Sequence, residues 1–346
     1  MYSDTIKSAL EKQVVGQSAA VSSVVRGVTR LVSGMMPRER SWCAYMFMGP
    51  TGTGKSHVIQ ALARTLHGDE RRLVVDSSAF VHGDPWIALS AQLAPMFMRQ
   101  QGGFPYGAVE ATPLSIIQID YIERGTKEMA KAVRSLLETG HVMLPDGHRG
   151  SLRNCLVFLT SGLCSREILD EAPRIGFTGT LEEDGEASEH DRVFDQCLAQ
   201  AEENFGSDLV GRLDSLVIFH RLEEHDLAQI LDRRIARLNR WLATRGFQCE
   251  LQPEARAFLQ ERGRRDLRKG ARDLVRAHRR FIEFPLADLL LSGRIPHGGV
   301  VVVDRKDGEE HLDFRVLQRE VAQPATTIGA ACREIPISWE EPPLLH

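Results

Sequence analysis

Residues 49–56 combine three glycines with a lysine and a hydroxyl group in the spacing GxxxxGK[ST]. Glycines at this spacing let successive backbone N–H groups turn inward on one anion, and a following helix N-terminus adds partial positive charge. The lysine then reaches the outer phosphates of a nucleotide, and the serine hydroxyl binds Mg²⁺. The expected nucleotide-binding residues of this phosphate loop are Gly49, Pro50, Thr51, Gly52, Thr53, Gly54, Lys55 and Ser56.

The segments on either side of the phosphate loop are suited to position it. The apolar run 44–48 precedes the loop as a strand, and residues 58–63 follow it with the pattern of a helix. A glycine-rich turn with a chance lysine is the alternative interpretation. The flanking strand and helix favour the phosphate loop.

A second apolar run, residues 114–120, ends in Asp120. A phosphate-loop protein needs an aspartate at such a strand end to hold the shell of Mg²⁺. A strand-end aspartate can also be a simple turn former. Because this one follows the loop, its strand and its helix at a fitting distance, we expect Ser56 and Asp120 on the metal side of the site.

The composition limits the class of protein. With 346 residues, 42% of them hydrophobic, the chain exceeds the usual single-domain size and can bury ordinary cores. A net charge of −4 gives no bulk argument for nucleic acid. The six cysteines lack metal-ligand spacing, and neither a signal sequence nor a membrane-length apolar run is present. We expect reduced thiols and a soluble, cytoplasmic protein without a membrane partner.

Apolar strand-like segments alternate with helix-like segments over the first two thirds of the chain. Such strands, separated by helices, predict a parallel sheet covered on both faces. Strands are expected at 44–48, 72–76, 114–120, 155–161 and 215–220, and helices at 4–13, 127–139 and 192–204. From residue 223 helices dominate, at 224–246, 253–262 and 267–291, with short strands at 247–251 and 300–304.

The expected fold class is therefore α/β, in two domains. A large domain with a parallel sheet and the phosphate loop spans 1–221, and a small, mainly helical domain spans 222–317. Residues 318–346 hold scattered prolines without a sustained period, which predicts an irregular tail.

Four short segments occur in an order that resembles a known family. They are Val14-Val15-Gly16-Gln17, the loop at 49–56, Arg174-Ile175-Gly176-Phe177 and Gly211-Arg212-Leu213-Asp214. In this order they resemble Clp-type AAA+ unfoldases, and above all the second ATPase module of ClpB, ClpA and ClpC. The similarity runs from about residue 8 to 305. It implies an AAA+ P-loop domain followed by a small helical domain of the Clp C-terminal type.

The resemblance also implies roles for single residues. Val15 would wall the adenine pocket of bound ATP or ADP, with Lys55 at the phosphates and Ser56 and Asp120 at Mg²⁺. Arg212 would be the arginine finger that completes the site of the adjacent subunit, and Arg272 the second sensor that reads the γ-phosphate. A surface arginine is the alternative for each of the two. A finger supplied in trans requires a ring, a hexamer in the family, or a filament.

Two positions depart from the family. Where the family has a glutamate that orients the attacking water, this chain has Tyr121. A phenol ionises about six pH units above a carboxylic acid and is a poor base at neutral pH. The family's first sensor, an asparagine, is Gly162 here, and glycine has no side chain to hold water or phosphate. Glu123 stands where the family also has an acid, so it is not an obvious replacement.

The segment at 93–103 matches the family's central-pore loop poorly. The family has an aromatic between glycines that grips polypeptide, whereas this chain has Pro95-Met96-Phe97-Met98, expected on a loop. Phe97 is either an apolar grip or a core residue, and the two alternatives stay open.

Two functions within protein remodelling or assembly follow from this pattern. One is an active ATPase that unfolds proteins by threading. The other is a nucleotide-binding switch or scaffold in which ATP assembles the ring and hydrolysis is slow. Losing one well-placed catalytic group costs about 10²- to 10⁴-fold in rate, and two such positions are changed here. The pattern favours the second function, with an active unfoldase as the alternative.

A third function, nucleic-acid association, is less favoured. Residues 262–280 form a basic stripe that could meet phosphates. Two aspartates interrupt the stripe, and no aromatics interleave as stacking platforms. A solvated helix face or a ring interface is the favoured interpretation.

Overall fold

A computed structural model of the chain describes residues 2–36, 40–79, 84–97, 109–110, 114–170, 189–305, 311–318 and 334–337. The chain divides into two compact units, Met1–Arg221 and Leu222–His346. Each unit has its own hydrophobic core.

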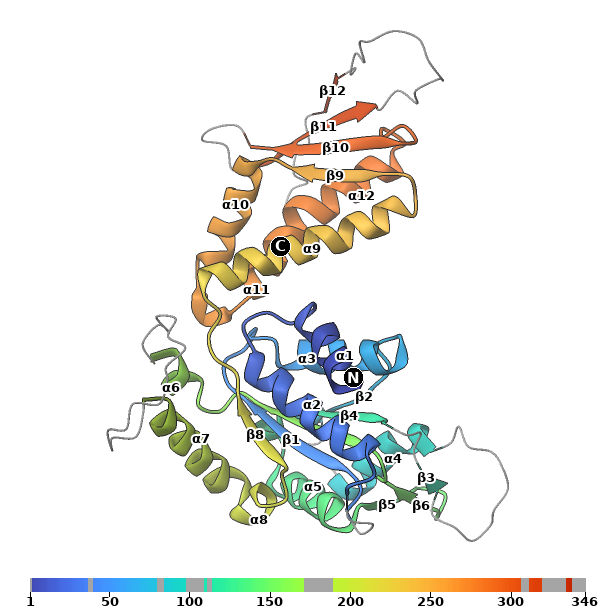
Figure 1. Cartoon of the computed structure of the whole chain (residues 1–346), viewed down its shortest axis with the longest axis vertical. Helices are drawn as coiled ribbons and strands as arrows, with labels where there is room; N and C mark the ends of the chain where they lie inside the picture. The colour runs from blue at the N-terminus through green and yellow to red at the C-terminus, as the bar shows by residue number, and fades with distance from the viewer. Residues whose placement is uncertain are drawn as a thin grey trace. The chain divides into compact units, whose positions relative to one another are not determined.

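The first unit is built on a five-stranded sheet (Figure 1). The strand order is β2-β4-β7-β1-β8, and all four pairings are parallel. The strands are β1 (Cys43–Met48), β2 (Leu73–Asp76), β4 (Ile116–Asp120), β7 (Leu156–Ser161) and β8 (Ser215–Ile218). The parallel α/β sheet predicted from the apolar strands is confirmed.

Helices cover both faces of this sheet, which explains why the central strands are mostly apolar on both sides (Figure 1). All six residues of β1 are buried; Tyr45 and Phe47 pack on one face, and Met46 and Met48 on the other. The first face carries α1 (Tyr2–Glu11), α2 (Ser18–Val32) and α3 (Lys55–His67). The second carries α4 (Pro85–Phe97), α5 (Lys127–Thr139), α7 (Glu189–Phe205) and α8 (Ser207–Val210).

Short elements complete the first unit. A hairpin of β5 (His141–Met143) and β6 (Arg149–Ser151) pairs with β3 (Val109–Glu110), as the Gly/Pro/Asp-rich composition of 140–153 predicts for the hairpin. Single turns at η1 (Ser77–Ala79) and η2 (Ile122–Arg124) follow β2 and β4, and α6 (Ser165–Asp170) follows β7.

The expectation of a loop is wrong for residues 95–97. These residues form the last turn of α4, and Phe97 is only 2% exposed. Its ring packs on Gly150 of β6, where an added Cβ would lie 2.9 Å from the ring. For Phe97 the core alternative holds, because this side chain is enclosed within the unit. Met98 and the rest of the 93–103 segment lie outside the described residues.

The second unit packs helices on a small sheet (Figure 1). Its helices are α9 (Glu224–Ala243), α10 (Pro253–Arg264), α11 (Arg272–His278) and α12 (Phe284–Leu291), with a 3-10 turn η3 (Leu267–Lys269) and a π-helical turn η4 (Arg279–Glu283). A reciprocal pair of side-chain to backbone hydrogen bonds between Glu223 and Asp226 caps α9. The single helix expected at 267–291 is broken after η3, because Gly270 adopts a positive φ of 57°.

The sheet of the second unit has the order β12-β11-β10-β9. Its strands are β9 (Gln248–Leu251), β10 (Gly299–Asp304), β11 (Asp313–Gln318) and β12 (Glu334–Ile337). The expectation of an irregular tail from residue 318 is wrong for residues 334–337, since β12 pairs antiparallel with β11. The five cysteines within the described ranges are buried free thiols. None of the described helices has the length and hydropathy needed to cross a membrane.

Candidate functional site

The phosphate loop joins the end of β1 to the start of α3. The ammonium group of Lys55 donates to the carbonyl oxygens of Gly49 and Pro50, at 2.5 and 2.8 Å. The Thr53 hydroxyl donates to the Pro50 carbonyl at 2.8 Å. The loop is thus folded on itself, with its lysine held over the loop backbone and Ser56 in the first turn of α3.

Two glycines are required by the geometry of this loop. Gly49 has φ = 131°, and a Cβ there would lie 2.5 Å from the carbonyl oxygen of Phe219. Gly54, with φ = 105°, is the N-cap residue of α3. Both backbone conformations are rarely adopted by other residues, so these glycines let the chain enter α3 with its free N–H groups at the loop.

The segment Val14-Val15-Gly16-Gln17 lies against the phosphate loop. The Gln17 side-chain amide, only 4% exposed, donates to the carbonyl of Thr53 at 3.3 Å and to that of His220 at 3.0 Å. Val15 is half-buried two residues earlier. Sequence reasoning missed Gln17 as a functional residue, because nothing in its spacing shows that it reaches the loop.

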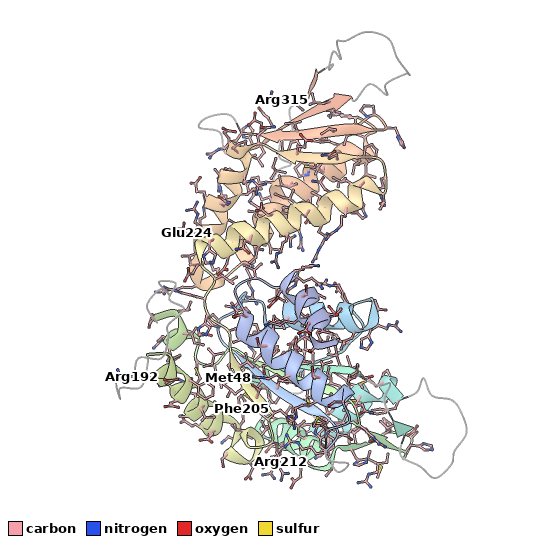
Figure 2. The ribbon with its side chains drawn as sticks, viewed as in Figure 1. Met48, Arg192, Phe205, Arg212, Glu224 and Arg315 are labelled. Atoms are coloured by element: carbon pink, nitrogen blue, oxygen red, sulfur yellow. The ribbon has the colours of Figure 1, made fainter. Side chains whose placement is uncertain are left out.

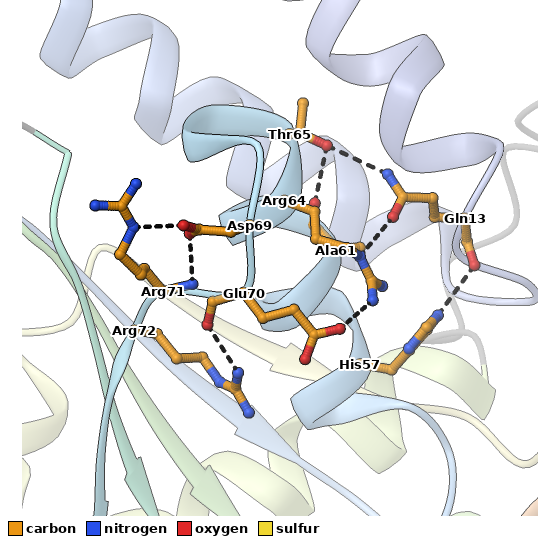
Figure 3. Close-up of polar contacts among 9 residues, drawn as sticks. All are labelled: Gln13, His57, Ala61, Arg64, Thr65, Asp69, Glu70, Arg71 and Arg72. Carbon is orange, nitrogen blue, oxygen red and sulfur yellow. Dashed lines mark hydrogen bonds and ion pairs between the residues drawn. The ribbon is translucent and has the colours of Figure 1, made fainter. Parts of the chain in front are cut away.

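A polar network also ties this segment to α3 (Figure 3). Gln13 accepts from Arg64 Nε at 3.0 Å through its side-chain oxygen, and its backbone carbonyl lies 3.1 Å from His57 Nε2. Arg64 also pairs with Glu70 at 2.5 Å. The residues that lead into Val15 are thereby held at a defined distance from the helix that follows the phosphate loop.

Asp120 ends β4 and is held by two neighbouring side chains. Its Oδ1 accepts from the Thr160 hydroxyl at 2.7 Å, and both of its oxygens accept from Gln118 Nε2, at 2.9 and 2.8 Å. Gln118 is 1% exposed and accepts in turn from Arg72 Nε at 2.8 Å. A carboxylate has about four acceptor positions. Three are used here, so Oδ2 retains one for a further donor.

The two positions that depart from the family lie beside Asp120. Tyr121 adopts a left-handed conformation, φ = 55°, and its ring lies 4.5 Å from the guanidinium of Arg124. Gly162 follows β7, and its backbone N–H donates to Glu123 Oε1 at 2.9 Å. The described side chains around the end of β4 thus include an acid, Glu123, two residues beyond the tyrosine.

The sheet register brings these residues to one edge. Met48 pairs with Ser161 across β1 and β7, and Ile119 with Leu159 across β4 and β7. The carboxyl ends of the three strands therefore lie side by side, which is where open parallel sheets bind ligands. The phosphate loop, Asp120, Tyr121 and Gly162 all follow directly from these strand ends.

Arg212 lies at the opposite edge. It precedes β8, whose first residue pairs with Tyr45, and Asp214 donates its backbone N–H to the Ala44 carbonyl at the amino end of β1. Five residue steps of a parallel strand span about 16 Å, so Arg212 and the loop after Met48 are well separated. Figure 2 labels Met48 and Arg212. Arg212 therefore does not reach the phosphate loop of its own chain.

Arg212 has polar partners within its own chain. Its guanidinium pairs with Glu138 at 2.9 Å, and its carbonyl accepts from Arg40. Arg272 belongs to the second unit, where it is the exposed first residue of α11. The segment Arg174-Ile175-Gly176-Phe177 lies outside the described residues.

The basic stripe at 262–280 is laced with ion pairs. Arg264 pairs with Glu224 at 2.8 Å, and Lys269 with Asp266 at 3.1 Å and Asp273 at 3.9 Å. Arg262 lies over the ring of Phe258, 5.0 Å from its centroid. These partners support the interpretation of the stripe as a solvated helix face.

Two protein families match the chain. The AAA domain (Cdc48 subfamily) matches residues 40–216, and the C-terminal, D2-small domain of ClpB protein matches residues 222–303. The first match contains the phosphate loop, Asp120 and Arg212. The second contains Arg272.

Individual proteins show the same likeness. The chain is 31% identical over 307 residues to the chaperone protein ClpB of Rhizobium meliloti (strain 1021), covering 88% of this chain and 34% of that protein. It is 28% identical over 305 residues to the negative regulator of genetic competence ClpC/MecB of Bacillus subtilis (strain 168), covering 88% and 37%. The chain thus spans about a third of the length of these relatives.

A solved structure supports the fold. A closed-state cryo-EM reconstruction of Hsp104 with ATPγS and FITC-casein matches with a TM-score of 0.70 at 21% identity, covering 90% of this chain and 51% of that chain. The expected architecture, a P-loop domain with a parallel sheet followed by a small helical domain, is confirmed by this match and by the second family match.

Proposed function

This chain belongs to the AAA domain family of the Cdc48 subfamily, and from that membership we propose that it is an ATP-binding, Clp-like protein that acts in protein remodelling or assembly. We propose further that its hydrolysis is weakened. The observation that carries this proposal is the contrast at one sheet edge between a complete phosphate loop and Tyr121, which brings no carboxylate to the family's catalytic position.

Mg²⁺ fits the donor set beside the loop. The cation prefers oxygen ligands and keeps several waters. The Ser56 hydroxyl and the remaining acceptor position on Asp120 Oδ2 supply such oxygens. When bound, Mg²⁺ neutralises charge on the β- and γ-phosphates. Within the chain, Lys55 would hold the same phosphates and the 14–17 segment, with Val15, the adenine.

Self-association into a ring, a hexamer by family resemblance, completes the proposal. Its support is the place of Arg212 at the sheet edge opposite the phosphate loop, since an arginine finger there would serve the site of a neighbouring subunit. Arg272 of the small domain would read the γ-phosphate. Both guanidiniums are planar cations that suit an anionic phosphoryl group.

A protein is the proposed substrate or partner, and the cytoplasm the proposed compartment. The names of relatives, among them "chaperone protein" and "ATP-dependent Clp protease ATP-binding subunit", support a protein over a nucleic acid. The ion pairs within the basic stripe support the same choice.

ATP binding and ATP turnover by the purified chain test this function. We expect the parent to bind ATP and to hydrolyse it slowly, Lys55→Ala to lose binding, and Tyr121→Glu to gain turnover by about 10²-fold or more. Ordinary turnover by the parent that Tyr121→Glu leaves unchanged would show the active unfoldase alternative instead. Mass measurement with and without ATP tests the ring, and a monomer in both conditions would exclude it.

A further inference from the structure

The carboxylate of Glu123 lies against the end of β7. Its Oε1 accepts the hydrogen bond from the Gly162 N–H at 2.9 Å. A Cβ at residue 162 would lie 3.1 Å from this same oxygen, closer than nine in ten such contacts. The absence of a side chain at Gly162 therefore leaves room for the carboxylate of Glu123.

The other oxygen, Oε2, is buried and has no hydrogen-bond partner among the residues that the structure describes. A buried acceptor without a donor costs about 1–3 kcal/mol, more when it is charged, and such atoms are rare in native proteins. An acceptor of this kind beside a nucleotide site is suited to a donor that enters with the ligand, and a water molecule is such a donor.

The position of Glu123 relative to the phosphate loop follows from the register. Because Met48 pairs with Ser161 in parallel strands, the next residues along, Gly49 and Gly162, leave the sheet side by side. Gly49 is the first residue of the loop, and Gly162 is the hydrogen-bond donor to Glu123. The carboxylate thus lies at the strand end next to the one that carries the phosphates.

Tyr121 does not compete for this place. The guanidinium of Arg124 lies over its ring, 4.5 Å from the centroid, which is the geometry of a cation–π contact. The backbone N–H of Tyr121 donates to the Thr160 hydroxyl at 3.3 Å. The Tyr121 ring therefore packs against Arg124, while Oε2 of Glu123, two residues on, has no donor among the described residues.

We propose, on the basis of the ATP site described above, that Glu123 is the catalytic residue of the hydrolysis that this chain retains. Oε1 is anchored on Gly162, and Oε2 accepts a proton from the attacking water. Glu123 thereby supplies the carboxylate that Tyr121 lacks.

The step balances with water and ATP alone. The water oxygen forms a bond to the γ-phosphorus, and the bond from that phosphorus to the β,γ-bridging oxygen breaks. The bridging oxygen leaves with the electron pair as part of ADP. One water proton passes to Glu123 Oε2 and then to the released phosphate.

Glu123→Gln in the full chain tests this role. Glutamine keeps the shape and can still accept from Gly162, but it cannot take a proton. The matched control is Glu128→Gln, the same change at a side chain that is 63% exposed and paired with Lys131 at 3.9 Å. Single-turnover hydrolysis and binding of a fluorescent ATP are measured on each protein.

We expect Glu123→Gln to hydrolyse ATP about 10²-fold more slowly with unchanged ATP affinity, and Glu128→Gln to match the parent. Adding Tyr121→Glu to Glu123→Gln should restore turnover, since a base is supplied again. If Glu123→Gln does not fold, Glu123→Asp, which keeps the charge but shortens the reach, should show the same direction.

Two results separate this role from the proposed function. Turnover by Glu123→Gln equal to the parent, or parent turnover no greater than that of Lys55→Ala, overturns the role of Glu123 and leaves ATP binding intact. A parent chain that binds no ATP overturns the proposed function itself.

Discussion

Gln118 and Asp120 lie on the same face of β4, and the amide of the first donates to both carboxylate oxygens of the second, at 2.9 and 2.8 Å. Arg72, directly before β2, donates to the Gln118 oxygen at 2.8 Å. The Gln118 amide therefore cannot flip without losing its hydrogen bonds to Asp120 and from Arg72. The orientation of the Asp120 carboxylate, the proposed Mg²⁺ ligand, is therefore set from within the sheet.

Replacing this amide should destabilise the protein. Gln118→Leu fills a similar volume but leaves the partner groups on Arg72 and Asp120 without their hydrogen bonds, so we expect a loss of about 1–3 kcal/mol in the free energy of unfolding. Urea unfolding measures it. A loss below about 0.5 kcal/mol would show that solvent satisfies both partners.

Charge at the same position should make the effect depend on pH. Gln118→Glu places two carboxylates within hydrogen-bond distance, and such a pair resists double ionisation. We expect a larger loss of stability at pH 7 than for Gln118→Leu, and partial recovery at a pH where the pair holds one proton. Equal stability of the two variants at all pH values would contradict this account.

Arg212 should act in trans. In a Tyr121→Glu background, Arg212→Ala and Lys55→Ala should each lower turnover by about 10³-fold or more. Mixing the two inactive proteins should recover part of the turnover, because an intact loop and an intact finger then meet at some interfaces. ATP turnover of the mixture, measured against each variant alone, checks this. Additive, near-zero turnover would remove the finger role from Arg212.

His278 should make the stability of the chain fall in acid. Burial and the nearby charge of Arg234 lower the pKa of this histidine from 6.5 to about 4, although its contact with Glu283 at 3.0 Å opposes the shift. The unfolded chain then binds more protons between these pH values. Stability is therefore complete above pH 6.5 and falls as the pH drops toward 4, by at most about 3 kcal/mol.

The His278→Leu variant isolates this contribution. Leucine suits a side chain that is 1% exposed, and Glu283 keeps its pair with Arg234 at 2.9 Å. Denaturant unfolding at a series of pH values should show a smaller loss between pH 6.5 and 4 than in the parent. An unchanged slope would mean that another group titrates in this window.

Phe97 should contribute to stability and not to substrate grip. Phe97→Ala removes a side chain buried on Gly150, so we expect a loss of about 3–5 kcal/mol. Ile87→Ala, on the same helix at a side chain 68% exposed, is the control and should change stability by less than about 0.5 kcal/mol. A stable Phe97→Ala protein would return the residue to the pore-loop interpretation.

Much of the fold could be predicted from local patterns. Helix α5 has the predicted bounds, 127–139, because Thr126 caps its start by accepting from the Met129 N–H and Gly140 ends it in a left-handed conformation. The buried strands β1 and β7 are predictable for a related reason, since a strand covered on both faces is an almost continuous apolar run.

Other elements depend on packing that a local pattern does not show. Leu89, Leu93 and Phe97 form a buried stripe on α4. The surrounding glycines and prolines obscure this stripe in the sequence, and Pro95 in the last turn favours a loop there. Strand β12 is stabilised by its pairing with β11. The sequence pattern of either segment alone does not show this pairing.

The site divides in the same way. The spacing of residues 49–56 predicts a phosphate loop because each of its groups is local to one turn, and the binding role of these residues stays a prediction. Gln17 and Gln118 could not be predicted, since a glutamine has no distinctive spacing and its role depends on which atoms the fold brings within 3 Å. The contact between Glu123 and Gly162 joins two strand ends and is likewise visible only in three dimensions.

The two hydrogen bonds donated by the Gln17 amide link the phosphate loop to residue 220. One buried amide holds both the Thr53 carbonyl, inside the phosphate loop, and the His220 carbonyl, next to the last residue of the first unit. A ligand that turns this amide by displacing the Thr53 carbonyl would therefore also change the hydrogen bond to the His220 carbonyl. In that case linkage requires that making or breaking the contact at residue 220 changes the affinity of the loop for that ligand by the same free energy.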